Sequence, residues 1–236
     1  MQEGQGCRII EEIGGLNMKI SWHGHSCVQI RTIGNHRIII DPFIRGNDLS
    51  DLDVNSLRVD TIILTHAHAD HVGDTIEIAK KTNADVIAIV ELADELRKHG
   101  ISAHGMNIGG EHAFAFGSVK FVPAIHSSSY EGREMGLAAG VIVNDEISTI
   151  YHCGDTALFS DMQLIPHTNA CFIPIGDNYT MGINDAVKAA TYIDSDLFIP
   201  IHYDTFPIIE QNPYEFTNKL PLVNGLVPDI GEEIEL

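Results

Sequence analysis

The chain has 236 residues, of which 44% are hydrophobic and 20% charged, so a packed core is expected rather than a disordered chain. Its formal net charge of −19 argues against a general nucleic-acid binder and against docking on anionic lipid, because both present phosphate groups. No apolar run approaches the roughly 18 residues of a membrane span, and the four cysteines are scattered without a CxxC pair, which favours a reduced, cytoplasmic protein.

The first quarter of the chain predicts paired strands and then a buried strand. Residues 1–17 are polar and lack the pattern of a signal peptide, so we treat them as an extension before a single domain at 18–236. Strands rich in β-branched residues are expected at 19–22, 27–33 and 37–40. The apolar run at 61–65 is typical of a strand buried on both faces.

The rest of the chain alternates between helical and extended patterns. The predicted helices cover 74–81, 91–99, 157–164, 184–193 and 213–219. The predicted strands cover 85–90, 113–116, 119–122, 137–143, 148–151, 170–175 and 197–201. This mixture without a linker predicts an α/β fold with two sheets packed face to face and helices outside.

Four candidate metal ligands fall within six residues, directly after the strand at 61–65. Their order is His66-x-His68-x-Asp70-His71. Imidazole and carboxylate suit zinc, iron and related transition metals. The loop leaving the strand can present His66 and His68 to one ion, and the next turn can present Asp70 and His71 to a second. A polar loop that is His-rich by chance is the alternative, which this density of ligands disfavours.

Three further candidates each follow a predicted strand. His126 follows the strand near 119–125, Asp155 the strand at 148–151, and His202 the strand at 197–201. Each would be an ordinary loop or core residue on its own. If the strands align, however, their carboxyl ends place these side chains on one rim with His66.

This order of ligands resembles the metallo-β-lactamase superfamily. Further segments resemble a branch of metal-dependent hydrolases related to ascorbate-phosphate lactonases and phospholipase D-like members: Trp22-His23-Gly24-His25-Ser26, Gly154-Asp155-Thr156, Pro174-Ile175-Gly176, Thr180-Met181-Gly182 and His202-Tyr203-Asp204-Thr205-Phe206-Pro207. The resemblance implies a four-layer αββα sandwich with the site at one edge of the sheets. It also implies that His66, His68 and His126 hold a first metal, that Asp70, His71 and His202 hold a second, and that Asp155 bridges both.

The expected chemistry is hydrolysis of a small-molecule ester, lactone or phosphodiester. Two divalent transition metal ions, zinc first and manganese, iron or nickel as alternatives, would share a hydroxide that attacks the substrate. Asp70 and Asp155 are the carboxylates expected at the reacting centre. Four residues are expected around the ligands or the substrate: His25, Asp41, Thr180 and Tyr203. Asp41 could orient a histidine ligand, and each of the four also has an ordinary structural explanation.

Other functions remain open alternatives. A flavin-partnered oxygen reductase usually has glutamate at the position of His68 and carries an appended flavin domain, and a nucleic-acid phosphodiesterase carries an inserted domain for which the spacing from His126 to Asp155 leaves little room. A non-catalytic metal-binding or sensor protein could keep the same ligands. No nucleic-acid or membrane partner is expected, and an oligomer is possible.

Overall fold

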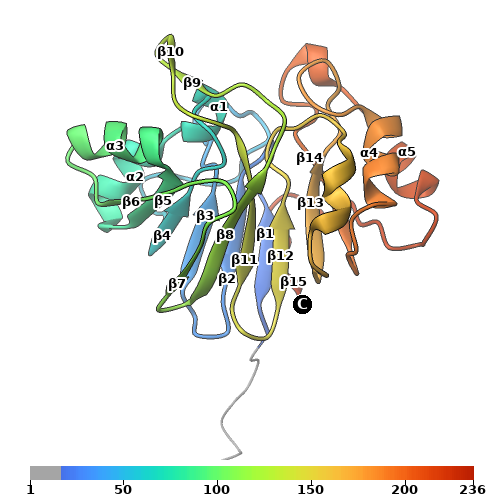
Figure 1. The fold of residues 1–236 in the computed structure, drawn as a ribbon, viewed down its shortest axis with the longest axis horizontal. Coiled ribbons are helices and arrows are strands. Elements are labelled where there is room, and N and C mark those ends of the chain that lie inside the picture. The colour runs from blue at the N-terminus through green and yellow to red at the C-terminus, as the bar shows by residue number, and fades with distance from the viewer. Residues whose placement is uncertain (1–16) are drawn as a thin grey trace, which may run out of the picture.

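Short strands rich in isoleucine and valine form two β-sheets that pack face to face at the centre of the molecule (Figure 1). The computed structural model describes residues 17–236, so the extension predicted at 1–17 lies outside the described residues except for its last position. Helices flank the sheets on both sides (Figure 1). The predicted αββα sandwich is therefore confirmed.

The first sheet has seven strands in the order β15-β1-β2-β3-β4-β5-β6. The strands are β1 (Lys19–Trp22), β2 (Val28–Arg31), β3 (Arg37–Ile40), β4 (Thr61–Ile63), β5 (Asp85–Ile89), β6 (Ala103–Met106) and β15 (Ile234–Glu235). Antiparallel pairing joins β1, β2 and β3, whereas β3 to β6 run parallel. Ile38, Ile39 and Ile40 are fully or almost fully buried, as a strand covered on both faces requires.

The second sheet has six strands in the order β14-β13-β12-β11-β8-β7. The strands are β7 (Glu111–Phe114), β8 (Gly117–Pro123), β11 (Ala139–Asn144), β12 (Thr149–His152), β13 (Ala170–Pro174) and β14 (Phe198–Ile201). β12, β13 and β14 run parallel. Between β8 and β11, β9 (Ser129–Tyr130) and β10 (Arg133–Glu134) form a hairpin that projects beyond the sheets near α1 (Figure 1).

The helices are short and lie outside the sheets. They are α1 (Ala69–Val72), α2 (Thr75–Thr82), α3 (Val90–Lys98), α4 (Ile183–Ala190) and α5 (Pro213–Lys219). In Figure 1, α2 and α3 lie on one side of the sheets and α4 and α5 on the other. None of the helices within residues 17–236 has the length and apolar character to cross a membrane.

The helix predicted at 157–164 is wrong in type and in length. The chain forms only a 3-10 turn, Ser160–Leu164. The backbone N–H of Ala157 donates to the carbonyl of Ile125. This bond ties the first residue of the predicted helix to a distant segment of the chain. At the other end Pro166 favours an extended Ile165, and Ile165 is extended (φ −64°, ψ 128°).

The carboxyl ends of the parallel strands meet at one edge of the sandwich. Asp41 directly follows β3 and His202 directly follows β14, while His66 and Asp155 each come three residues after a strand. The sheets hold these strand ends rigidly, because the inner faces are packed with large buried side chains such as Phe121 and Phe172. This edge, called the rim below, carries the candidate site.

Candidate metal centre

All seven predicted metal ligands lie together on the rim. Three groups of ligand atoms each lie within 4.8 Å of one another: His66 with His68 and His126; His66 with His71 and Asp155; and His25 with Asp70, His71 and His202. The first and second groups share His66, and the second and third share His71. The predicted ligands therefore form one continuous cluster, and His25 joins it.

The carboxylate of Asp155 lies at the centre of four histidines. Its Oδ2 atom is 3.0 Å from His202 Nε2, 3.4 Å from His71 Nε2, 3.6 Å from His126 Nε2 and 4.0 Å from His66 Nε2. Asp155 can reach this position because Gly154 adopts a left-handed conformation (φ +62°) and passes close to the carbonyl of Ala139. The carboxylate is buried and faces ring nitrogens of both predicted metal groups.

Asp41 holds two of the histidines in a defined orientation. Its Oδ2 atom accepts hydrogen bonds from His71 Nδ1 (2.7 Å) and from the Thr65 hydroxyl (2.6 Å), and its Oδ1 accepts from the Thr65 backbone N–H (2.9 Å). Because the Thr65 proton points to Asp41, the Thr65 oxygen accepts from His66 Nδ1 at 3.0 Å. One buried carboxylate thus fixes the tautomers of His71 and His66, with the Nε2 lone pair of each ring pointing into the cluster.

The ligand atoms of the cluster suit a metal ion. Several of them are buried and have no hydrogen-bond partner among the described residues. His71 Nε2, Asp155 Oδ1 and both ring nitrogens of His202 are buried without a hydrogen-bond partner among the described residues. With its proton on Nδ1, His71 directs a lone pair at the Asp155 carboxylate, so two acceptors face each other in a buried site. Such a contact is unfavourable unless a proton or a metal cation lies between the two atoms.

The electrostatics of the cluster keep three of its histidines and Asp155 in their metal-binding protonation states. Burial lowers the pKa of His66, His68 and His126, which keeps these rings neutral. Burial would raise the pKa of Asp155, but His202 and His71 outweigh it and hold that pKa well below its usual range. Burial also works against a positive charge on His71, yet Asp155 and Asp41 outweigh it and raise its pKa. The negative field that would hold a proton there also attracts a metal cation.

Other residues singled out from the sequence lie in different surroundings. The Thr180 hydroxyl donates to the carbonyl of Met181, in a turn after β13. The buried ring of Tyr203 stacks on Trp22 at 5.1 Å. Arg133, in the β9–β10 hairpin, forms an ion pair with Glu95 of α3 at 2.9 Å. Cys153, two residues before Asp155, is buried with its Sγ 3.6 Å from Cys171 Sγ.

Sequence reasoning missed residues that support the ligands rather than provide them. Thr65 immediately precedes the histidine motif, and this adjacency is the signal that could have identified it. The Thr205 hydroxyl lies 3.0 Å from His25 Nδ1, a contact between residues that are distant in sequence. Gly176 passes so close to the backbone after β14 that a Cβ there would lie 2.2 Å from the His202 carbonyl oxygen.

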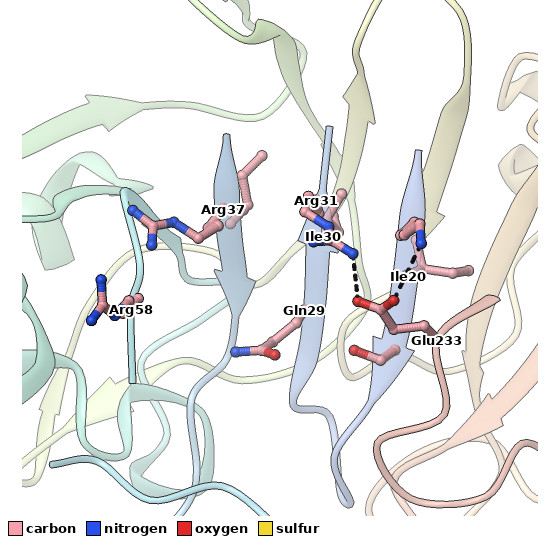
Figure 2. Close-up of a pocket in the computed structure, with 10 residues that line it drawn as sticks. Ile20, Gln29, Ile30, Arg31, Arg37, Arg58 and Glu233 are labelled. Carbon is pink, nitrogen blue, oxygen red and sulfur yellow. Dashed lines mark hydrogen bonds and ion pairs between the residues drawn. The ribbon is translucent and has the colours of Figure 1, made fainter. Parts of the chain in front are cut away.

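A separate cavity of about 170 Å³ lies on the outer face of β1, β2 and β3, and no candidate ligand lines it (Figure 2). Arg31, Arg37 and Arg58 contribute positive charge to it. Arg31 forms an ion pair with Glu233 at 2.8 Å, shown in Figure 2, and Arg37 with Asp60 at 2.7 Å. The charges of Arg31 and Arg37 are thus offset by neighbouring acids.

Comparisons with known proteins agree with this geometry. The model of the β-lactamase superfamily domain matches residues 36–203. A Bacillus thuringiensis protein named UPF0173 metal-dependent hydrolase is 51% identical over 228 residues, which cover 93% of this chain and all of the relative.

Two solved structures illustrate the fold. Igni18, a metallo hydrolase from the hyperthermophilic archaeon Ignicoccus hospitalis, superposes with a TM-score of 0.86 and 33% identity, covering 93% of this chain and 98% of Igni18. An isothiocyanate hydrolase from Delia radicum gut bacteria shares the fold at a TM-score of 0.73 and 19% identity, covering 92% and 98% of the two chains. The chain therefore belongs to the UPF0173 family of metal-dependent hydrolases within the metallo-β-lactamase superfamily.

Proposed function

We propose that the protein hydrolyses a small ester, lactone or phosphodiester at a centre of two divalent transition metal ions, with zinc expected first. His66, His68 and His126 would hold one ion, and Asp70, His71 and His202 the other, with Asp155 shared between them. The observation that carries this proposal is the set of buried ligand atoms around Asp155 that have no hydrogen-bond partner among the described residues. Two such ions, when bound, lower the pKa of water toward neutrality and polarise the scissile carbonyl or phosphoryl oxygen.

The protein's own residues hold the proposed ligands in the orientation that metal binding requires. Asp41 and Thr65 fix the ring orientation of His71 and His66, so that the Nε2 atoms point inward without rearrangement. Such prior orientation lowers the cost of reorganisation during the reaction. Asp70 is half-buried, whereas Asp155 is buried, so Asp70 faces the side of the cluster from which a substrate can approach.

The charge and the cysteines support the remaining parts of the proposal. A net charge of −19 suits a small-molecule substrate that is drawn to local metal charge better than it suits a nucleic acid. The thiols of Cys27, Cys153 and Cys171 are free, which fits a reducing compartment such as the cytoplasm.

The test compares the wild type with Asp155→Ala, and with Asp60→Ala as a matched control. Asp60 is an aspartate that pairs with Arg37 away from the cluster. Bound metal is measured by mass spectrometry, and turnover is measured on a nitrophenyl phosphodiester, a nitrophenyl ester, a thioester and lactones. We expect about two metals per chain, as a two-metal site requires, and turnover of one class by the wild type and Asp60→Ala only.

Two results would contradict the proposal at different steps. A wild type that binds no transition metal after careful reloading would show that the ligand assignment is wrong. A fully loaded wild type that turns over no member of the panel would exclude the proposed substrate classes and favour a metal-binding or sensor role for this chain.

A further inference from the structure

The ring of His25 lies within reach of the second metal position. We propose that His25 is itself a ligand of the second ion, through its Nε2 atom, alongside Asp70, His71 and His202. This inference rests on the proposed function, since it requires the second metal ion. It adds a ligand from the turn between β1 and β2, outside the histidine motif and outside the seven residues assigned above.

The backbone fixes His25 before any ligand binds. Its φ angle is +52°, in the left-handed region that costs a residue with a Cβ about 1 kcal/mol or more. The His25 carbonyl accepts two hydrogen bonds, from Trp22 Nε1 and from the backbone N–H of His202, both at 2.9 Å. The second bond ties the turn to the residue that directly follows β14. The strained turn is thus built to hold His25 beside His202.

The His25 ring is packed between other rings, and its nitrogen atoms face polar groups. The His25 ring centroid is 4.1 Å from that of His202, and the ring meets Phe43 and Phe206 edge-on at 5.5 and 5.6 Å. The side chain is fully buried. Its two nitrogens meet side-chain oxygens: Nδ1 lies 3.0 Å from Thr205 Oγ1, and Nε2 lies 3.2 Å from Asp70 Oδ2.

The Thr205 hydroxyl is placed to support the tautomer of His25 that a metal ion needs. When this hydroxyl donates to the Tyr203 carbonyl at 3.3 Å, its oxygen accepts the proton of His25 Nδ1 at 3.0 Å. The Nε2 atom then carries a lone pair directed at the Asp70 carboxylate, and two acceptors meet at 3.2 Å. A shared cation resolves this contact. His25, Asp70, His71 and His202 place their ligand atoms within 4.8 Å of one another, as such a cation requires.

An additional ligand alters which metals suit the second position. Together with Asp155 the set becomes rich in nitrogen and oxygen donors, beyond the four ligands that zinc takes in most structural sites. Ions that accept imidazole and prefer more than four ligands, such as iron and nickel, are favoured by such a set. The proposal therefore predicts that the two metal positions differ in their preference, with the second position less selective for zinc.

The test uses the protein loaded with an NMR-active cadmium isotope and nitrogen-labelled histidine. A scalar coupling between cadmium and a ring nitrogen arises only through a direct bond, so it separates a ligand from a residue that merely contacts Asp70. We expect His25→Asn to remove the coupling of one histidine. It should also weaken metal binding at the second position by roughly 10- to 1000-fold, because losing a ligand should cost at least as much as losing a residue that orients one. Asparagine tolerates the left-handed backbone at this position.

Two further variants keep the test decisive. His23→Asn changes a histidine of the same turn that is bonded to Asp51 instead, and it should leave every coupling unchanged. Thr205→Val should shift the Nδ1 resonance of one coupled histidine, which identifies His25 even if His25→Asn does not fold. Couplings at other histidines but none at His25 would overturn this inference alone. No cadmium bound by the wild type would overturn the proposed metal centre as well.

Discussion

Replacing Asp41 with asparagine should weaken the metal centre without removing a ligand. The new side chain keeps the size of the old one, and asparagine tolerates the positive φ of this position (+47°). One carboxylate oxygen of Asp41, Oδ2, accepts two hydrogen bonds in the wild type, from His71 and from the Thr65 hydroxyl. An amide NH₂ group placed there would face both donors. His71 must then lose this bond or move its proton to Nε2, the atom proposed to bind the metal.

The size of the effect follows from the bond that is lost. A hydrogen bond to a charged group contributes about 1.5–3 kcal/mol, and each tenfold change in affinity corresponds to about 1.4 kcal/mol. We therefore expect about 10- to 100-fold weaker metal binding in Asp41→Asn, in line with other residues that orient metal-bound histidines. His71 belongs to the second position, so that position should lose more affinity than the first.

Competition with a chelating dye measures both affinities, and circular dichroism checks that the variant is folded. Thr65→Val is the matched comparison, because it removes only the hydroxyl that links Asp41 to His66. It should weaken the first position more than the second. If folded Asp41→Asn binds both metals as tightly as the wild type, Asp41 does not control the tautomer of His71, and the orientation argument fails.

Three further outcomes are expected. Gly176→Ala should lower the free energy of unfolding by about 1–3 kcal/mol in denaturant titrations, because the new Cβ would lie 2.2 Å from the His202 carbonyl; an unchanged midpoint would contradict this. On acidification, the first metal should stay bound below pH 6.5, the ordinary imidazole pKa, since lowered pKa values keep His66, His68 and His126 neutral there; release measured above pH 6.5 would refute it. At free metal near 100 times Kd, chelation should remove about 2.7 kcal/mol of stability per site, seen as a lower Tm; an unchanged Tm would argue against metal binding by the folded state.

Strands and helices with strong local patterns were predictable. The isoleucine run of β3 and the apolar run before His66 are buried in the structure as expected. α5 was predicted with its observed bounds, because Pro213 suits the first turn and the Asn212 side chain caps the helix by accepting from the Tyr214 N–H. In these segments local preference and burial agree.

Edge strands and the smallest elements were not predictable. β6 was missed because its residues are only partly buried apart from Met106, and glycine and histidine interrupt the pattern. β15 has two residues, and it is a strand only because β1 pairs with it. Such elements depend on a partner far away in the sequence rather than on their own composition.

The residues of the candidate site also differ in how well the sequence could predict them. The histidine motif is local, so its four proposed ligands could be recognised from their spacing. The approach of His25 to Asp70 joins residues 45 positions apart and depends on a left-handed turn that no pattern in the sequence specifies. Similarly, the pairing of Arg133 with Glu95 depends on how the β9–β10 hairpin rests against α3.

The β9–β10 hairpin has a consequence for how this family can diversify. It projects beside the rim yet contains none of the proposed ligands, which the strand ends and the short turns after them hold in place (Figure 1). Doubling the length of a flexible loop costs only about 0.6 kcal/mol. The proposed metal ligands therefore place no direct constraint on residues 129–134, and this hairpin can accept insertions at little cost in folding free energy.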